Sequence, residues 1–224
     1  MLRTSTANDL PAIARCHRTA FPGSLATALG QRYVVRMLSW YLSTDKTFLF
    51  HHEDGPGRCI GYCGGIISDG SLHTGSASGM AQHAFKEAVL ACLTHPQVFF
   101  HPELRAKWPV LRKNILMKLG LQKRVHFSEE QKKQMAQDPH AGLVVIGVDP
   151  GRQGKGYGSL LLQEFERRAM EQYGIHKLQL TVLSGNQAAI RAYERNGWQR
   201  GKAKGQSVEM VKILRDNKPT PQSP

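Results

Sequence analysis

The chain has 224 residues, a formal net charge of +13 and 41% hydrophobic residues, and its length suits one large domain or two small ones. No apolar run approaches the roughly 20 residues of a membrane span, and the strand-like N-terminus does not resemble a signal peptide. The four cysteines lack paired C-x-x-C spacing, and neither they nor the ten histidines are spaced as metal ligands. We therefore expect a cytoplasmic protein with free thiols and no metal site.

The first 68 residues predict a strand, two helices and a hairpin. The expected elements are a strand at 2–6, helices at 9–20 and 33–42, and strands at 47–51 and 59–68. Asn8 or Asp9 can cap the first helix. Gly64 and Gly65 lie inside the last strand, and they predict a bulge or a close approach of another segment to the backbone.

Residues 69–140 are expected to form a helical insertion, because a structureless loop of this length is improbable inside a compact domain. The expected helices lie near 80–94, 102–119 and 128–137. Between residues 103 and 124, seven Lys and Arg side chains are countered only by Glu103. They alternate with apolar residues at helical spacing, which is typical of a basic amphipathic helix.

This basic segment has three interpretations: a solvated cationic face over a core stripe, a site for an anionic substrate, or peripheral contact with an acidic membrane surface. We do not expect a nucleic acid partner, because no aromatic-interleaved platform or helix-turn-helix pattern is visible.

Residues 144–159 predict a buried strand, a glycine-rich turn and the start of an amphipathic helix. The turn reads Gln153-Gly154-Lys155-Gly156-Tyr157-Gly158. Its glycines remove the Cβ atoms that would keep an anion away from the backbone. The first N–H groups of the helix have no intrahelical partner and its dipole favours negative charge, so the segment predicts a diphosphate site. The spacing fits neither a Walker nor a Rossmann loop.

A strand is expected at 176–183, followed by a helix that Asn186 caps and Gly197 ends. The order Gln153-x-x-Gly156-x-Gly158 resembles the phosphate-binding signature of the GNAT N-acetyltransferases. The segment from Asn186 to Trp198 resembles the N-x-x-A-x-x-x-Y-x-x-x-G-F/W segment of the same family, with Tyr193 at the tyrosine. The resemblance covers residues 141–214 and, less distinctly, residues 1–68.

The resemblance implies the α/β GNAT fold: one mixed, mostly antiparallel sheet of about seven strands flanked by helices. It implies a single domain over residues 1–215 with the insertion at 69–140. Residues 216–224 contain three prolines and little apolar surface, and they are expected to form a disordered tail.

The resemblance also implies an acetyl-CoA-dependent N-acetyltransferase that acts on a primary amine of a small molecule. Residues 20–30 and the insertion resemble members associated with bacterial surface-polysaccharide and amino-sugar biosynthesis, which suggests an amino sugar or nucleotide-amino sugar. The alternatives are a protein or peptide N-acetyltransferase and a non-catalytic acyl-CoA-binding sensor module. The oligomeric state is not indicated.

By the same resemblance, the coenzyme lies between the strand that ends at Val148 and the strand at 176–183, which should splay apart. An oxyanion contact falls to the Val148 N–H. Tyr193 takes the position of the general acid that protonates the leaving thiolate, and packing on the cofactor alone is its alternative. The expected coenzyme-binding residues are Ile146, Val148, Gln153, Gly154, Lys155, Gly156, Tyr157, Gly158, Ser159 and Asn186.

Two roles stay open. Asn186 is expected to contact the coenzyme or only to cap its helix. The candidates for the general base are Asp69, His73, Asp138, His140 and a water chain, and the sequence does not choose among them.

Overall fold

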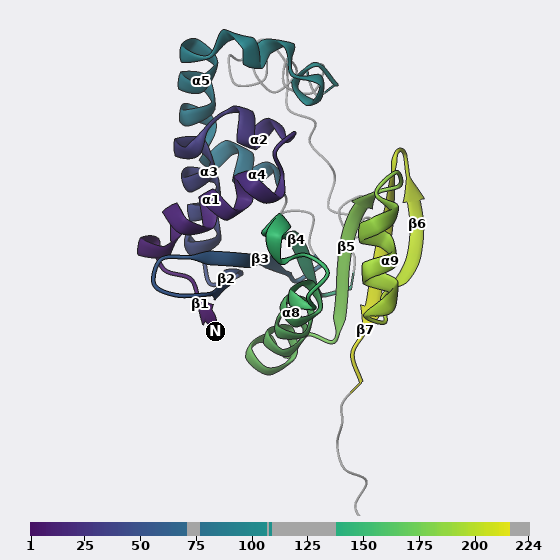
Figure 1. The fold of residues 1–224 in the computed structure, drawn as a ribbon. Helices are drawn as coiled ribbons and strands as arrows, with labels where there is room; N and C mark the ends of the chain where they lie inside the picture. The colour runs from purple at the N-terminus through teal and green to yellow at the C-terminus, as the bar shows by residue number, and fades with distance from the viewer. Residues whose placement is uncertain (71–76, 107, 109–137, 216–224) are drawn as a thin grey trace, which may run out of the picture.

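The computed structural model describes residues 1–70, 77–106, 108 and 138–215. Seven strands in this part of the chain form one sheet in the order β1-β2-β3-β4-β5-β7-β6 (Figure 1). The strands are β1 (Leu2–Thr4), β2 (Thr47–Glu53), β3 (Cys59–Ser68), β4 (His140–Val148), β5 (Lys177–Leu183), β6 (Gln199–Lys204) and β7 (Ser207–Ile213). Only β4 and β5 run parallel, so the predicted mixed, mostly antiparallel sheet is confirmed.

Helices cover both faces of the sheet. The α-helices are α1 (Leu10–Ala20), α2 (Leu25–Ala28), α3 (Gln31–Ser39), α4 (Ala77–His83), α5 (Phe85–Thr94), α8 (Tyr157–Tyr173) and α9 (Gln187–Arg195). The 3-10 helices are η1 (Ala7–Asp9), η2 (Trp40–Leu42), η3 (Pro96–Phe100) and η4 (Pro150–Arg152). Figure 1 shows α1, α3 and α4 above β3 and α8 below it.

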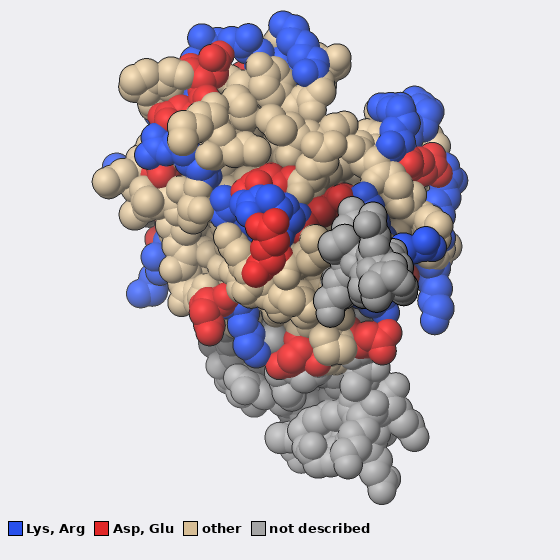
Figure 2. All heavy atoms as spheres, turned by 90° about the horizontal axis from the view of Figure 1, so that it is seen from below, with Lys and Arg blue, Asp and Glu red and all other residues tan. Residues whose placement is uncertain are grey.

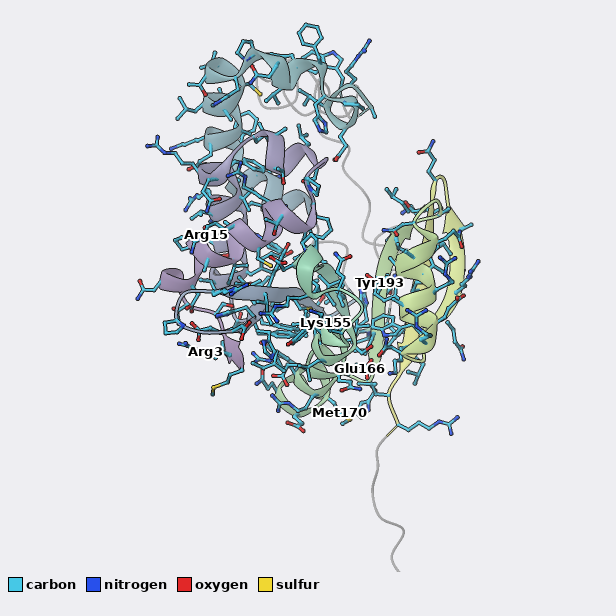
Figure 3. The ribbon with its side chains drawn as sticks, viewed as in Figure 1. Arg3, Arg15, Lys155, Glu166, Met170 and Tyr193 are labelled. Atoms are coloured by element: carbon cyan, nitrogen blue, oxygen red, sulfur yellow. The ribbon has the colours of Figure 1, made fainter. Side chains whose placement is uncertain are left out.

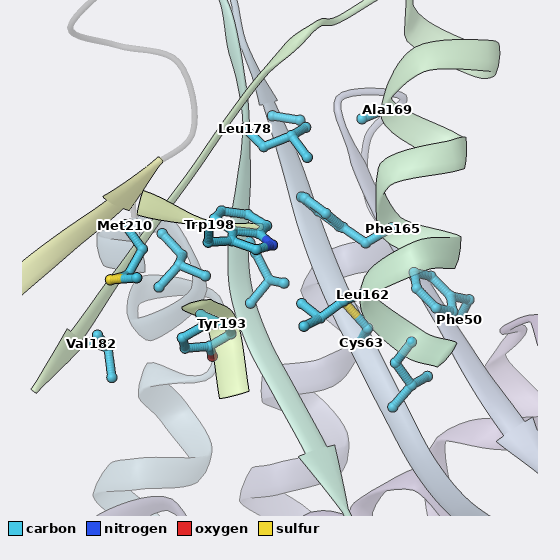
Figure 4. Close-up of a cluster of buried hydrophobic side chains, with 14 of the residues drawn as sticks. Phe50, Cys63, Leu162, Phe165, Ala169, Leu178, Val182, Tyr193, Trp198 and Met210 are labelled. Carbon is cyan, nitrogen blue, oxygen red and sulfur yellow. The ribbon is translucent and has the colours of Figure 1, made fainter. Parts of the chain in front are cut away.

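Two apolar clusters lie back to back across the sheet and form the core. On the upper face, α1 and α3 pack against Leu49 and Tyr62. On the lower face, Phe165 of α8 and Trp198 pack against the side chains of β5 and β7 (Figure 4). Within the described residues, no helix is both long enough and apolar enough to cross a membrane.

The structure corrects the elements expected around the insertion. The helix expected at 80–94 is two helices, α4 and α5, which are separated at the buried residue Ala84. The carbonyl of His83, just before the break, accepts a hydrogen bond from Arg36 Nε at 3.3 Å. Residues 102–106 and 108 are helical. The remainder of the helix expected at 102–119, the helix at 128–137 and the tail at 216–224 lie outside the described residues.

Two further differences concern the N-terminal helices. The short helix α2 was not expected. Neither Asn8 nor Asp9 caps α1 with its side chain, because the Asp9 carboxylate accepts hydrogen bonds from the backbone N–H and hydroxyl of Thr6, each at 2.8 Å. Asp9 therefore closes the preceding turn, η1.

The bulge predicted at Gly64 and Gly65 is confirmed. Gly64 pairs with Val145 and Gly65 with Leu143, which leaves Val144 as the extra residue of β4. A Cβ atom at Gly65 would lie 2.3 Å from Phe48 Cζ, so the close approach is confirmed as well. The bulge shifts the alternation of β4, so Val144 and Val145 both pack in the upper cluster.

A buried histidine joins α1 to β3. His17 Nδ1 lies 2.5 Å from the hydroxyl of Tyr62, and His17 Nε2 has no hydrogen-bond partner among the described residues. Only 6% of His17 is exposed, and this burial lowers its pKa to about 4. The folded state therefore holds a neutral histidine at pH values where an exposed one would be protonated.

We expect His17 to make the fold sensitive to acid. In the unfolded chain the histidine titrates near pH 6.5, and in the folded protein near pH 4. The free energy of unfolding therefore falls by about 3 kcal/mol as the pH is lowered from 6.5 to 4, and it is not affected by His17 above pH 6.5. His17→Asn keeps a polar atom near Tyr62 and removes the titration. The free energy of unfolding is measured by urea denaturation at pH 7 and at pH 4.5. Its decrease between these two pH values should be smaller in this variant than in wild type. The exposed His95→Asn is the control, and an unchanged pH dependence in His17→Asn would contradict this account.

Candidate active site

β4 and β5 are paired at only three positions and then separate. The pairs are Ala141 with Leu178, Gly142 with Gln179 and Leu143 with Leu180. Both strands continue beyond the last pair. There β4 stays paired with β3, and β5 stays paired with β7. The separation begins at the bulge, and it confirms the splay predicted from the sequence. We call the space between the separated ends of β4 and β5 the gap.

The backbone of β4 presents hydrogen-bonding groups to the gap. The N–H of Asp149, just after β4, donates to the carbonyl of Ile60 in β3 at 2.9 Å. Because backbone groups alternate in direction along a strand, the N–H and C=O groups of Val148 and Ile146 point away from β3 and toward the gap. Gln153 Nε2 donates to the Val148 carbonyl at 3.1 Å. The Val148 N–H has no strand partner in the described part, because the pairing of β4 with β5 ends at Leu143. An extended ligand with amide groups could pair along this edge.

The glycine-rich loop leads from β4 to the N-terminus of α8. Asp149 Oδ1 accepts a hydrogen bond from the Gly151 N–H at 2.9 Å and fixes the start of the turn. Gly154 and Gly156 have φ values of +74° and +84°, in the left-handed region that favours glycine. Among the described residues, no heavy atom beyond the adjoining residues and the local helix backbone lies within 4 Å of a Cβ built at Gly154, Gly156 or Gly158. The loop is therefore open above the start of a 17-residue helix, which is a suitable place for an anion.

The C-terminal end of α9 lies beside the first turn of α8. Asn196 Nδ2 donates to Ser159 Oγ at 3.1 Å. Tyr193, three residues earlier, is 9% exposed and packs against Trp198 with ring centroids 6.0 Å apart. Figure 3 shows Tyr193 and Lys155 between the two halves of the sheet.

The Tyr193 phenol belongs to the lower cluster. Burial raises its pKa to about 12, with a smaller contribution from the Cys63 thiol. Cys63 is the partner of Ile146 across β3 and β4. The phenol therefore lies near the stretch of β4 that borders the gap. Figure 4 shows it in the same cluster as Leu162 and Val182.

The other predicted coenzyme-binding residues have defined contacts. Lys155 Nζ donates to the Gly151 carbonyl at 3.3 Å, and the Tyr157 ring packs edge-on against His52 at 5.1 Å. Asn186 Oδ1 accepts a hydrogen bond from the Ala189 N–H at 3.2 Å, so Asn186 caps α9. Asn186 lies about 14 Å along the helix axis from the end of α9 that meets α8. Its contact with the coenzyme stays a prediction.

The structure places three candidate bases at the closed end of the gap. Ser68, just before Asp69, pairs with His140 at the start of β4, and Asp138 lies two residues earlier. His140 is about 13 Å along the strand from the bulge. Lys46 pairs with Asp69 at 3.1 Å, and Lys177 pairs with Asp138 at 2.7 Å and lowers the pKa of its carboxyl group. His73 lies outside the described residues.

Positive charge lies along the edge of the sheet that carries β6. Figure 2 shows Lys and Arg side chains along this side, and the exposed residues of β6 include Arg200, Lys202 and Lys204. Such a field attracts a polyanion such as coenzyme A. In the part of the chain that the structure describes, no group of three or more His, Cys, Asp or Glu residues is arranged to hold a metal ion.

Comparisons with known proteins agree with this geometry. Residues 124–198 match the model of the acetyltransferase (GNAT) family. The PaiA N-acetyltransferase from Thermoplasma acidophilum, solved with coenzyme A, aligns at a TM-score of 0.53 and 14% identity, over 96% of this chain and 98% of that chain. A ribosomal-protein-alanine N-acetyltransferase from Brucella melitensis aligns at 0.51 and 16%, over 96% and 99%. A mutant spermidine N-acetyltransferase from Vibrio cholerae aligns at 0.53 and 14%, over 95% and 92%. A sequence search of curated proteins gives no match.

The family match includes β4, the glycine-rich loop, α8, β5 and α9, which together build the gap. The sheet around these elements has the GNAT fold. The segment at residues 124–198 is therefore similar to the GNAT acetyltransferases, enzymes that take their acetyl group from acetyl-CoA.

Proposed function

We propose that this enzyme acetylates a primary amine of a small molecule, with acetyl-CoA in the gap between β4 and β5. The observation that carries the proposal is that three features meet at the gap. They are the edge of β4 at Ile146 and Val148, with which β5 does not pair, the open loop at Gly154–Gly158, and the phenol of Tyr193. We also infer that residues 1–215 act as one domain, because a single sheet runs from β1 to β7.

In the proposed reaction, the neutral amine attacks the thioester carbonyl carbon and a C–N bond forms. The carbonyl electron pair moves onto oxygen, where the Val148 N–H donates a hydrogen bond; one such donor contributes about 3 kcal/mol in other enzymes. The carbonyl then re-forms, the C–S bond breaks, and the amine proton leaves through water. Proximity of amine and thioester supplies a large part of the rate.

Tyr193 donates a hydrogen bond to the leaving thiolate. Its raised pKa of about 12 keeps the phenol protonated at neutral pH. The same pKa makes the phenol a weaker acid than an ordinary thiol, which titrates near 8.5. We therefore expect Tyr193 to stabilise the developing negative charge on sulfur, and solvent to complete the protonation of coenzyme A.

A screen of acetyl-CoA consumption against amines tests this function. The panel contains amino sugars, nucleotide-amino sugars, diamines, polyamines and lysine peptides, and thiol release reports turnover. Solved structures with this fold include a spermidine N-acetyltransferase and a ribosomal-protein-alanine N-acetyltransferase. The fold is therefore compatible with both small-molecule and protein acceptors. We expect turnover with small amines, and an amino-sugar acceptor is one of the outcomes. Turnover with peptides alone would indicate a protein acetyltransferase, and binding without any turnover would indicate a sensor module.

A further inference from the structure

One face of β5 and β7 is open beside the gap. Leu180 and Val182 of β5 pack in the lower cluster, whereas the intervening Thr181 is exposed and Leu183 is 63% exposed. Gln179 shares this upper face, because it lies two residues from Thr181 on the same strand. In the described part of the chain, the upper cluster that α1 and α3 form takes in β2, β3 and β4 but not β5 or β7. An acceptor can therefore approach the gap across this face.

A carboxylate is fixed on the open face. Glu209 of β7 pairs directly with Thr181 across the two strands. Glu209 Oε1 accepts a hydrogen bond from Gln179 Nε2. A Cβ at Gly201 would lie 2.7 Å from Glu209 Oε2, so glycine at this position leaves room for the carboxylate.

Glu209 differs from most other described carboxylates because it has no cationic partner among the described residues. Glu164 and Glu166, for example, pair with Arg168 and Lys212 at 2.7 and 2.8 Å. Glu209 is held by a neutral amide instead, and its Oε2 has no hydrogen-bond partner in the described part of the chain. In a chain of net charge +13, this leaves the Glu209 carboxylate available to a cation from outside.

The position of Glu209 relates it to the reaction. Thr181 is the first residue of β5 beyond the last pair with β4, Leu143–Leu180, so it borders the gap. β7 lies one strand spacing farther, about 5 Å. A short alkyl chain would therefore be long enough to join a group bound to Glu209 to an amine in the gap.

We propose that Glu209 binds a second, cationic amino group of the acceptor, and that the acceptor is a small diamine or polyamine. This inference rests on the proposed function. One amino group reacts as the neutral amine in the gap, and the other stays protonated and contacts Glu209 Oε2, with the Thr181 hydroxyl alongside. The same carboxylate repels the phosphates of a nucleotide-amino sugar.

Glu209→Gln tests the proposal with two matched amines. Glutamine keeps the shape of the side chain and removes its charge. We expect wild type to show about a tenfold higher kcat/KM for diaminobutane than for aminobutane, since one hydrogen bond between charged groups at a partly buried position is worth about a factor of ten. Glu209→Gln should remove this preference, mainly by raising the KM for diaminobutane, and should change kcat/KM for aminobutane less than about threefold. Added salt should reduce the preference in wild type.

Glu171→Gln is the control, because Glu171 pairs with Arg167 on α8, away from the open face. It should leave the preference unchanged. Equal kcat/KM values for the two amines in wild type, or an equal loss for both in Glu209→Gln, would overturn the assignment of Glu209 and leave the proposed function intact. A complete lack of transfer to any amine would overturn both.

Discussion

Gly156→Glu should abolish acetyl-CoA binding, with a rise in the dissociation constant of at least about 100-fold. Gly156 precedes α8, and the space where a Cβ would lie is open. Glutamate would put a side chain and a negative charge where the diphosphate is expected, so both sterics and repulsion oppose binding. Titration calorimetry with the folded variant measures the effect.

The variant also introduces backbone strain, which needs its own control. Gly156 has φ +84°, and a non-glycine residue there costs roughly 1–2 kcal/mol. Gly174 has φ +64° and ends the same helix, again with open space around a Cβ. Gly174→Glu should therefore lower stability to a similar extent and leave acetyl-CoA affinity unchanged. Similar affinities in the two variants would show that the glycine-rich loop does not hold the diphosphate.

Tyr193→Phe should lower kcat by about 10²-fold while the KM for acetyl-CoA changes little. A group that transfers its proton fully contributes about 10²–10⁴-fold. Tyr193, with its raised pKa, donates only a hydrogen bond to the developing thiolate, so we expect the lower end of that range. The ring would still pack against Trp198, so the substitution removes only the hydroxyl. An interaction made mainly in the transition state appears in kcat rather than in substrate binding. Steady-state kinetics with saturating amine measures both constants.

Tyr173→Phe is the matched control, because Tyr173 lies at the far end of α8 and its ring stacks on Phe48. Its turnover should equal that of wild type. Wild-type turnover in Tyr193→Phe, with chemistry shown to be rate-limiting by single-turnover measurements, would remove Tyr193 from the mechanism. The fold and the position of the coenzyme would be unaffected by that result.

The elements that build the gap could be predicted because their signals are local. Glycines at 154–158 mark the turn, and the alternation of apolar residues marks β5. Gly64 and Gly65 indicated a bulge or a close approach because glycine inside a strand is typical of both. In the structure a Cβ at either position would meet an aromatic ring of the core. Each of these signals depends on a few neighbouring residues and on general sterics.

Other features depend on contacts that are distant in the sequence. The break at Ala84 coincides with a hydrogen bond from Arg36, which no local pattern indicates. β6 is exposed along its whole length and has no apolar alternation, so only its pairing with β7 identifies it as a strand. Glu209 was missed for the same reason. Its significance depends on the position of β7 relative to the gap, which the alternation of residues 207–213 alone does not give.

A crystal structure with acetyl-CoA tests the central claim most directly. We predict that the diphosphate oxygens lie about 2.9 Å from backbone N–H groups of residues 154–158. The pantetheine amides should pair with the free edge of β4 at Ile146 and Val148, and the sulfur should lie within hydrogen-bonding reach of the Tyr193 hydroxyl. A coenzyme bound elsewhere, with the gap between β4 and β5 empty, would contradict this account.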